Sequence, residues 1–167
     1  MQLRLAEKKD LRQIAQLYVE NWRETYYGLL SQGYLDGLSA EKKETEWSAY
    51  IQIPRQGIFV VEEDGEVLGF AAFKSYHRVE DCIYLDSLHV RKARQGEGIG
   101  TQLIHRVYQQ GLAENYGKMG VCVVKGNDRA RQLYIKLGAV HAQHKTDDFT
   151  GEVSYSEILL WNDLKEK

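Results

Sequence analysis

The sequence predicts an α/β (α+β) fold in which a mixed, mostly antiparallel central sheet carries helices on both faces. Three observations point to this class. Apolar residues recur at helical spacing in some segments and in strand-like runs in others. Asp64-Gly65 separates two β-rich segments, which is typical of a hairpin and therefore of antiparallel pairing. Helix-like segments stand both before and between the strand-like ones, so that both faces of a sheet can be covered.

The N-terminal third is predicted to contain one strand and two helices. Residues 2–5 alternate polar and apolar side chains, as in a short strand. A helix capped by Asp10 follows, and its apolar face consists of residues spaced by three and four: Leu11, Ile14, Leu17, Tyr18, Trp22 and Tyr26. Glycines 28, 33 and 37 interrupt that pattern. Ser39 then begins a second, more polar helix that ends before Pro54.

The rest of the chain is predicted to be mainly strands, at 58–63, 66–74, 82–90, 121–124, 139–145 and 153–161. A glycine-rich turn at 96–100 leads into a helix, and Asn127 begins another that Gly138 ends. The expected order is β-α-α-β-β-β-α-β-α-β-β. Because neither a linker nor a repeat interrupts it, residues 1–167 are expected to form a single domain.

Composition narrows the function classes. The 167 residues include 22 Lys+Arg and 24 Asp+Glu, and a net charge of -2 gives no electrostatic basis for a nucleic-acid partner. No apolar run approaches the roughly 20 residues of a membrane span, so no membrane partner is expected. The first ten residues carry charges where a signal peptide needs an apolar core. A cytoplasmic location is therefore expected.

Cysteines and histidines give no metal pattern. Cys82 and Cys122 are too few for a disulfide scaffold, lack the spacing of a zinc site, and are expected to be buried free thiols. His141 and His144 lie three apart in a predicted strand, so their side chains are expected on opposite faces. No metal is therefore expected.

A glycine-rich loop between a strand and a helix carries the clearest chemical signal. It spans residues 88–101, with glycines at 96, 98 and 100. Glycines lack Cβ atoms, so successive backbone amides approach an anion closely, and the helix that follows adds its positive N-terminal end. A phosphate or pyrophosphate group is the expected ligand of this loop.

Three known sequence patterns of nucleotide-binding loops can be compared with this segment. A Walker loop needs Gly-Lys-Ser/Thr at its end, which is absent. The dinucleotide pattern G-x-G-x-x-G fails because Thr101 stands at its third glycine. The pattern Gln/Arg-x-x-Gly-x-Gly/Ala after a strand matches residues 95–100 in full, from Gln95 to Gly100.

This match and a second motif resemble the GCN5-related N-acetyltransferase (GNAT) superfamily. Residues 127–139 look like its signature Asn-x-x-Ala-x-x-Leu-Tyr-x-x-x-Gly-Phe, with Ala139 in place of the final Phe. The resemblance covers residues 58–161 and extends loosely to the N-terminal helices. It implies a GNAT-like fold and an acetyl-CoA-dependent N-acetyltransferase.

The resemblance also implies a cofactor site for acetyl-CoA as cosubstrate. Leu88, His89 and Val90 would form the strand edge that pairs with the pantetheine arm. The pyrophosphate would be held by the loop that comprises Gln95, Gly96, Glu97, Gly98, Ile99, Gly100 and Thr101. Glu97 stands where many relatives have Lys or Arg. Its negative charge could be offset by Arg91, Lys92 and Arg94; alternatively, these three residues form an ordinary solvated basic turn. Asn127 is interpreted as a helix cap, a contact to the cofactor arm, or both.

Two residues are candidates for catalysis. The resemblance implies that Tyr134 protonates the departing thiolate, whereas by itself it would be interpreted as a core aromatic. Alternation places Asp86 on the same strand face as Leu88 and Val90, and it is the leading candidate for the general base. The alternative is that its side chain binds the backbone at a bulge. Many relatives carry that carboxylate where this chain has Tyr84. Glu24 is the alternative base.

The acceptor is expected to be a small-molecule or peptide primary amine that attacks the thioester directly. An aromatic wall of Trp22, Tyr26, Tyr27 and Tyr34, with Glu20 and Glu24 nearby, would suit a cationic or amphipathic amine, or is an ordinary helix face. His89 is expected to point away from the Asp86 face as a surface residue. The other function kept open is a non-catalytic acyl-CoA binding or sensor protein of the same fold. A homodimer is possible, since dimers are common among the relatives.

Overall fold

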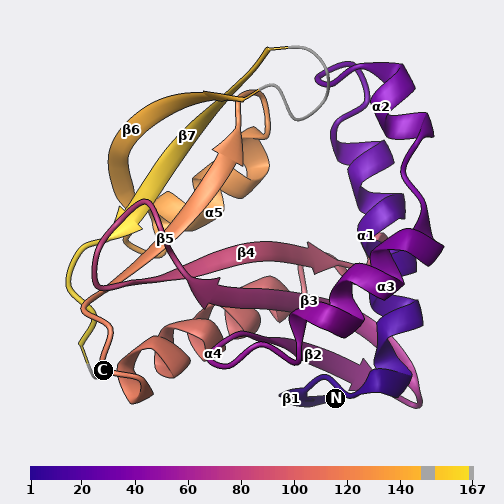
Figure 1. Ribbon diagram of the computed structural model, residues 1–167, viewed down its shortest axis with the longest axis horizontal. Coiled ribbons are helices and arrows are strands. Elements are labelled where there is room, and N and C mark those ends of the chain that lie inside the picture. Colours follow the sequence, from indigo (N-terminus) through magenta and orange to yellow (C-terminus); the bar gives the residue numbers. More distant parts are fainter. Residues whose placement is uncertain (148–152, 166–167) are drawn as a thin grey trace.

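The computed structural model describes residues 1–147 and 153–165. Within them the strands are β1 (Gln2–Leu5), β2 (Gly57–Glu63), β3 (Glu66–Ser75), β4 (Cys82–Val90), β5 (Lys118–Val124), β6 (Val140–Asp147) and β7 (Ser154–Trp161). They form one sheet in the order β1-β2-β3-β4-β5-β7-β6 (Figure 1). Neighbours are antiparallel except β4 and β5, which run parallel. The expected mixed, mostly antiparallel sheet is confirmed.

Helices cover both faces of this sheet (Figure 1). They are α1 (Leu11–Thr25), α2 (Gln32–Asp36), α3 (Ala40–Tyr50), α4 (Ile99–Ala113) and α5 (Asp128–Lys136), with short 3-10 turns at Lys8–Asp10 and Lys92–Arg94. Ile14 and Trp47 of α1 and α3 pack with Phe70 on one face. Leu103 and Tyr134 of α4 and α5 pack on the other. Among the described residues, no helix has both the length and the apolar character needed to cross a bilayer.

Local side-chain chemistry sets the helix ends near the N-terminus. Ser39 caps α3 as expected, since its Oγ accepts from the Lys42 amide at 3.2 Å. Asp10 is buried but does not cap α1, because its carboxylate accepts from the Glu7 amide and from Arg4. The short helix α2, absent from the sequence prediction, begins where Ser31 caps it. Gly33 lies inside this helix rather than breaking it, because the Ser31 cap satisfies the first turn.

The prediction for the two C-terminal histidines is wrong. His141 pairs with Leu159 while Gln143 pairs with Ile158, so an extra residue forms a bulge in β6. A bulge reverses the alternation of side chains, and the two histidine rings therefore meet with centroids 4.6 Å apart. His141 Nδ1 also lies 2.6 Å from the Glu157 carboxylate of β7.

Candidate active site

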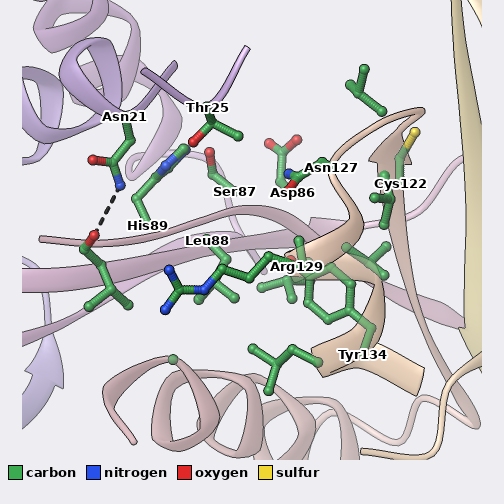
Figure 2. A pocket seen from close by; sticks show the side chains of 18 of the residues that line it. Asn21, Thr25, Asp86, Ser87, Leu88, His89, Cys122, Asn127, Arg129 and Tyr134 are labelled. Carbon is green, nitrogen blue, oxygen red and sulfur yellow. Dashed lines mark hydrogen bonds between the residues drawn. The ribbon is translucent and has the colours of Figure 1, made fainter. Parts of the chain in front are cut away.

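The parallel strands β4 and β5 separate partway along their length. Their pairing runs from Cys82 and Lys118 to Leu85 and Val121, although β4 continues to Val90. The space between them is part of a cavity of about 610 Å³, which also reaches α1, the glycine loop and α5. Figure 2 shows Thr25, Ser87, Asp86 and Asn127 on one side of this cavity and Tyr134 on the other. Predicted site residues of α1, β4, the glycine loop and α5 thus line one cleft.

Asp86 occupies a bulge at the point where the strands part. Ser87 pairs with Ala72 and Leu85 with Phe73, which leaves Asp86 as the extra residue on β4. Leu88 and Val90 consequently pack toward the α4 and α5 core. Asp86 instead lies 3.8 Å from Lys74 of β3. The predicted shared face of Asp86, Leu88 and Val90 is therefore wrong, although all three line the cavity.

The Asp86 carboxylate lies near enough to phenols of three elements to raise their pKa values. Burial, and after it the nearby Asp86 carboxylate, raises the pKa of Tyr50 on α3. Asp86 also contributes to the raised pKa values of Tyr18 and Tyr84, in which burial is again the largest cause. Glu24, the alternative base, bonds to Lys92 and is not part of the cavity lining. Of the two candidates, only Asp86 faces the cleft.

The glycine loop presents an open edge to the cavity. Gly96 and Gly98 have positive φ angles of 89° and 83°, and a Cβ added to either would meet nothing within 4 Å. Helix α4 begins directly after Gly98. Of the predicted segment Gln95 to Thr101, all residues line the cavity except Glu97. The local backbone therefore fits an anion held by consecutive amides.

Glu97 is neutralised by a neighbour in its own loop. Arg94 Nε donates to the Glu97 carboxylate at 2.8 Å, and Arg94 Nη1 donates to Glu63 at 2.7 Å. The other two basic residues of the turn also have acidic partners: Arg91 pairs with Glu66, and Lys92 with Glu24. The Glu97 carboxylate, which departs from the family pattern, is thus outside the cavity lining, and its negative charge is balanced by Arg94.

Asn127 and Tyr134 face the cleft from α5. The Asn127 side chain makes no capping bond and instead donates to the Tyr26 hydroxyl of α1 at 3.4 Å. Tyr134 is 6% exposed, and its ring contacts Trp161 edge to face. Burial raises the pKa of Tyr134, with Tyr26 as the second cause, so its hydroxyl keeps its proton near neutral pH. The cap interpretation of Asn127 is wrong.

His89 is not the surface residue that alternation predicts. Its ring lies 5.3 Å from the rings of both Tyr18 on α1 and Phe70 on β3, measured between centroids. Burial is the main cause that lowers its pKa to about 3, with Lys43 as the second cause, so the imidazole is neutral. Because the bulge at Asp86 changes the alternation, His89 and Asp86 both lie toward α1 and α3.

The aromatic residues of the N-terminal helices fall into two groups. The rings of Trp22 and Tyr26 lie 4.5 Å apart, and both line the cavity. The ring of Tyr34 lies 6.3 Å from that of Trp22, measured between centroids, but Tyr34 does not line the cavity. Tyr27 is 74% exposed and stands outside the cluster. The wall predicted from sequence is therefore formed by Trp22 and Tyr26.

Sequence reasoning missed further lining residues, among them Asn21, Arg129 and Cys122. Asn21 of α1 donates to the Val90 carbonyl at 3.1 Å, as the dashed line in Figure 2 shows. It is a polar residue on the buried helix face, at the spacing of Leu17, and that spacing was the available signal. Arg129 Nη1 donates to Gln95 Oε1 at 2.6 Å. Cys122 is a half-buried thiol that lines the cleft, whereas Cys82 is buried as expected.

Over the described part of the chain, no three His, Cys, Asp or Glu side chains gather as a metal site.

Comparisons with known proteins agree with this geometry. The family model described as "Acetyltransferase (GNAT) family" matches residues 12–139. An uncharacterized N-acetyltransferase of Archaeoglobus fulgidus is 30% identical over 139 residues, which are 80% of this chain and 89% of that protein.

Solved structures show the same likeness. An N-acetyltransferase from Staphylococcus aureus Mu50 is 26% identical, with a TM-score of 0.77 over 98% of each chain. A putative acetyltransferase from Salmonella typhimurium, solved with its cofactor acetyl-CoA, shares the fold at 21% identity. Its TM-score is 0.75, over 100% of this chain and 95% of that one.

Proposed function

The chain belongs to the acetyltransferase (GNAT) family, and we propose that its cleft transfers the acetyl group of acetyl-CoA to a primary amine by direct attack, with Tyr134 as general acid. The observation that carries this proposal is the separation of β4 and β5 beyond Leu85 and Val121. The cavity that it opens has the glycine loop at one end and Tyr134 in its wall.

The cosubstrate is proposed to enter between the separated strands. The pantetheine arm would pair with β4 at Leu88, His89 and Val90, along the edge that faces β5. Among the described residues, no strand pairs with that edge beyond Leu85. The amides from Gln95 to Thr101 would hold the pyrophosphate, and the open space beside Gly96 and Gly98 supports that placement. Asn127 would contact the arm, since its amide group faces the cleft rather than its own helix.

The proposed chemistry is a single transfer. The amine nitrogen forms a bond to the acetyl carbon, and the carbon–sulfur bond breaks. The departing sulfur takes the hydroxyl proton of Tyr134, which regains a proton lost by the amine nitrogen. The buried position of Tyr134 supports this role in one respect: burial raises the pKa of the phenol, so its proton is present at neutral pH when the carbon–sulfur bond breaks. No metal ion is needed.

Asp86 is proposed as the base that makes the amine reactive. Amines are mostly ammonium ions at pH 7, so one proton must leave before attack. The bulge directs Asp86 into the cleft beside the phenols of Tyr50 and Tyr84. The acceptor would approach along Trp22 and Tyr26, whose rings suit a cationic or amphipathic small-molecule or peptide amine.

The direct test is a panel of amines assayed for two products at once. Release of CoA thiol and formation of the N-acetylated amine are measured together for diamines, amino acids, aminoglycosides and peptide N-termini. Equal amounts of both products with at least one amine support acetyl transfer. Tight CoA binding with neither product across the panel would instead favour the sensor function. A Gly98→Asp variant, in which the glycine loop is blocked, is the negative control.

A further inference from the structure

The positive charges around the cofactor cleft differ in how they are compensated. Arg94 lines the cavity but donates to two carboxylates, Glu63 and Glu97. Lys145, on the opposite side, lies 2.8 Å from the Asp147 carboxylate. Arg129 also lines the cavity, yet its side chain donates a hydrogen bond to the neutral amide oxygen of Gln95. Among the described residues of the lining, Arg129 is the cation whose charge is not offset by an ion pair.

Arg129 occupies a position opposite the glycine loop. It lies in the first turn of α5, and its contact with Gln95 at 2.6 Å spans the gap between that helix and the start of the loop. Figure 2 shows its side chain extending away from α5 and across the cavity. Gln95 stands immediately before Gly96 and Gly98, whose amide edge is open. An anion seated on those amides would therefore meet Arg129 from the other side.

We propose that Arg129 is a further binding residue for the cosubstrate: it closes over the pyrophosphate of a CoA thioester, opposite the amides of the glycine loop. This inference rests on the proposed function, since it takes the pyrophosphate position from it. The Gln95 contact holds the guanidinium near the mouth of the cleft. A diphosphate competes well for this group, because charge-assisted bonds from arginine to phosphate oxygens are stronger than a bond to a neutral amide.

Calorimetry with three variants tests the proposal. Arg129→Gln removes the charge from an exposed side chain and is expected to fold with an unchanged melting temperature. Affinity for CoA should fall about tenfold or more, the usual effect of losing a charge-assisted bond. Affinity for dephospho-CoA, which keeps the pyrophosphate and lacks the 3′-phosphate, should fall by the same factor. Arg129→Lys should retain part of the lost affinity.

Lys136→Gln is the matched control, because it removes one positive charge from the exposed last residue of the same helix. It should bind CoA like the wild type. Equal affinity of Arg129→Gln and wild type for CoA would overturn the inference, as would an equal loss in Lys136→Gln. A loss seen with CoA and not with dephospho-CoA would also contradict it, because the 3′-phosphate would then be the contact. Failure of the wild type itself to bind CoA would refute the proposed function instead.

Discussion

Leu85 and Val121 are the last residues that pair between β4 and β5, and beyond them the two strands diverge around a cavity. A parallel pair in the middle of a sheet normally continues to the strand ends, because unpaired main-chain groups in an interior are costly. The unpaired edge of β4 is therefore a place where a ligand can supply the missing hydrogen bonds. The glycine loop, Asp86 and Tyr134 all face this one opening.

Changing Gly98 tests the placement of the pyrophosphate. Gly98→Asp puts a negative charge beside the proposed anion site, and CoA binding measured by calorimetry should become undetectable. Gly98→Asn is the matched control, because it has nearly the same shape without the charge and tolerates the positive φ of 83°. It should keep measurable binding. Unchanged affinity in a folded Gly98→Asp variant would refute this placement.

Glu157 links stability to pH. Arg131 is the first cause that lowers the pKa of Glu157 to about 2, with burial acting in the opposite direction and His141 adding to the lowering. Since the folded pKa lies below the ordinary glutamate value of 4.5, the stabilisation is present above that value and is lost as pH falls toward 2.

Glu157→Gln should therefore cost about 1 kcal/mol at pH 7, a value reduced by the solvent exposure of Arg131. The difference in free energy of unfolding between the variant and wild type should shrink between pH 5 and about pH 3. Urea denaturation across this pH range measures it. A cost that stays constant would show that the ion pair does not carry the effect.

Asp86→Asn tests the general base. If Asp86 accepts the proton of the amine, kcat/KM at neutral pH should fall by about 10²-fold. The acidic limb of its pH profile should disappear, because the group that loses activity on protonation is gone. Glu24→Gln is the control, as Glu24 pairs with Lys92 outside the cavity lining, and it should keep the wild-type profile. An acidic limb preserved in Asp86→Asn would assign the base elsewhere.

Patterns local in sequence predicted most of this fold. The hairpin at Asp64-Gly65, the cap at Ser39 and the strand at 82–90 depend on neighbouring residues, and the structure has all three. The errors in side-chain direction come from bulges, which shift alternation without a sequence signature. One bulge turns Asp86 and His89 toward α1 and α3, and another brings His141 against His144.

Some site residues could likewise be predicted from local sequence patterns, whereas others depend on contacts between distant segments. Gln95 to Thr101 and Tyr134 belong to motifs, so the positions in the cleft of all of them except Glu97 follow from strand and helix order. The contact of Asn127 with Tyr26 joins segments about a hundred residues apart, and no local pattern encodes it. Arg129 lies inside a predicted motif, yet its importance depends on which other cations are already paired, and only the structure shows that.

The most direct test of the account is the turnover of Tyr134→Phe. The change keeps the ring and its contact with Trp161 and removes only the hydroxyl, so folding and the KM for acetyl-CoA should stay close to wild type. Tyr116→Phe is the control, since that buried hydroxyl has no hydrogen-bond partner among the described residues and lies outside the cavity lining. The measurement is kcat on an identified amine, under conditions where chemistry is rate-limiting. If Tyr134 is the general acid, kcat should fall by about 10²-fold or more in Tyr134→Phe and should not fall in Tyr116→Phe. Full kcat in Tyr134→Phe would contradict the general-acid role and leave Tyr134 as a core aromatic.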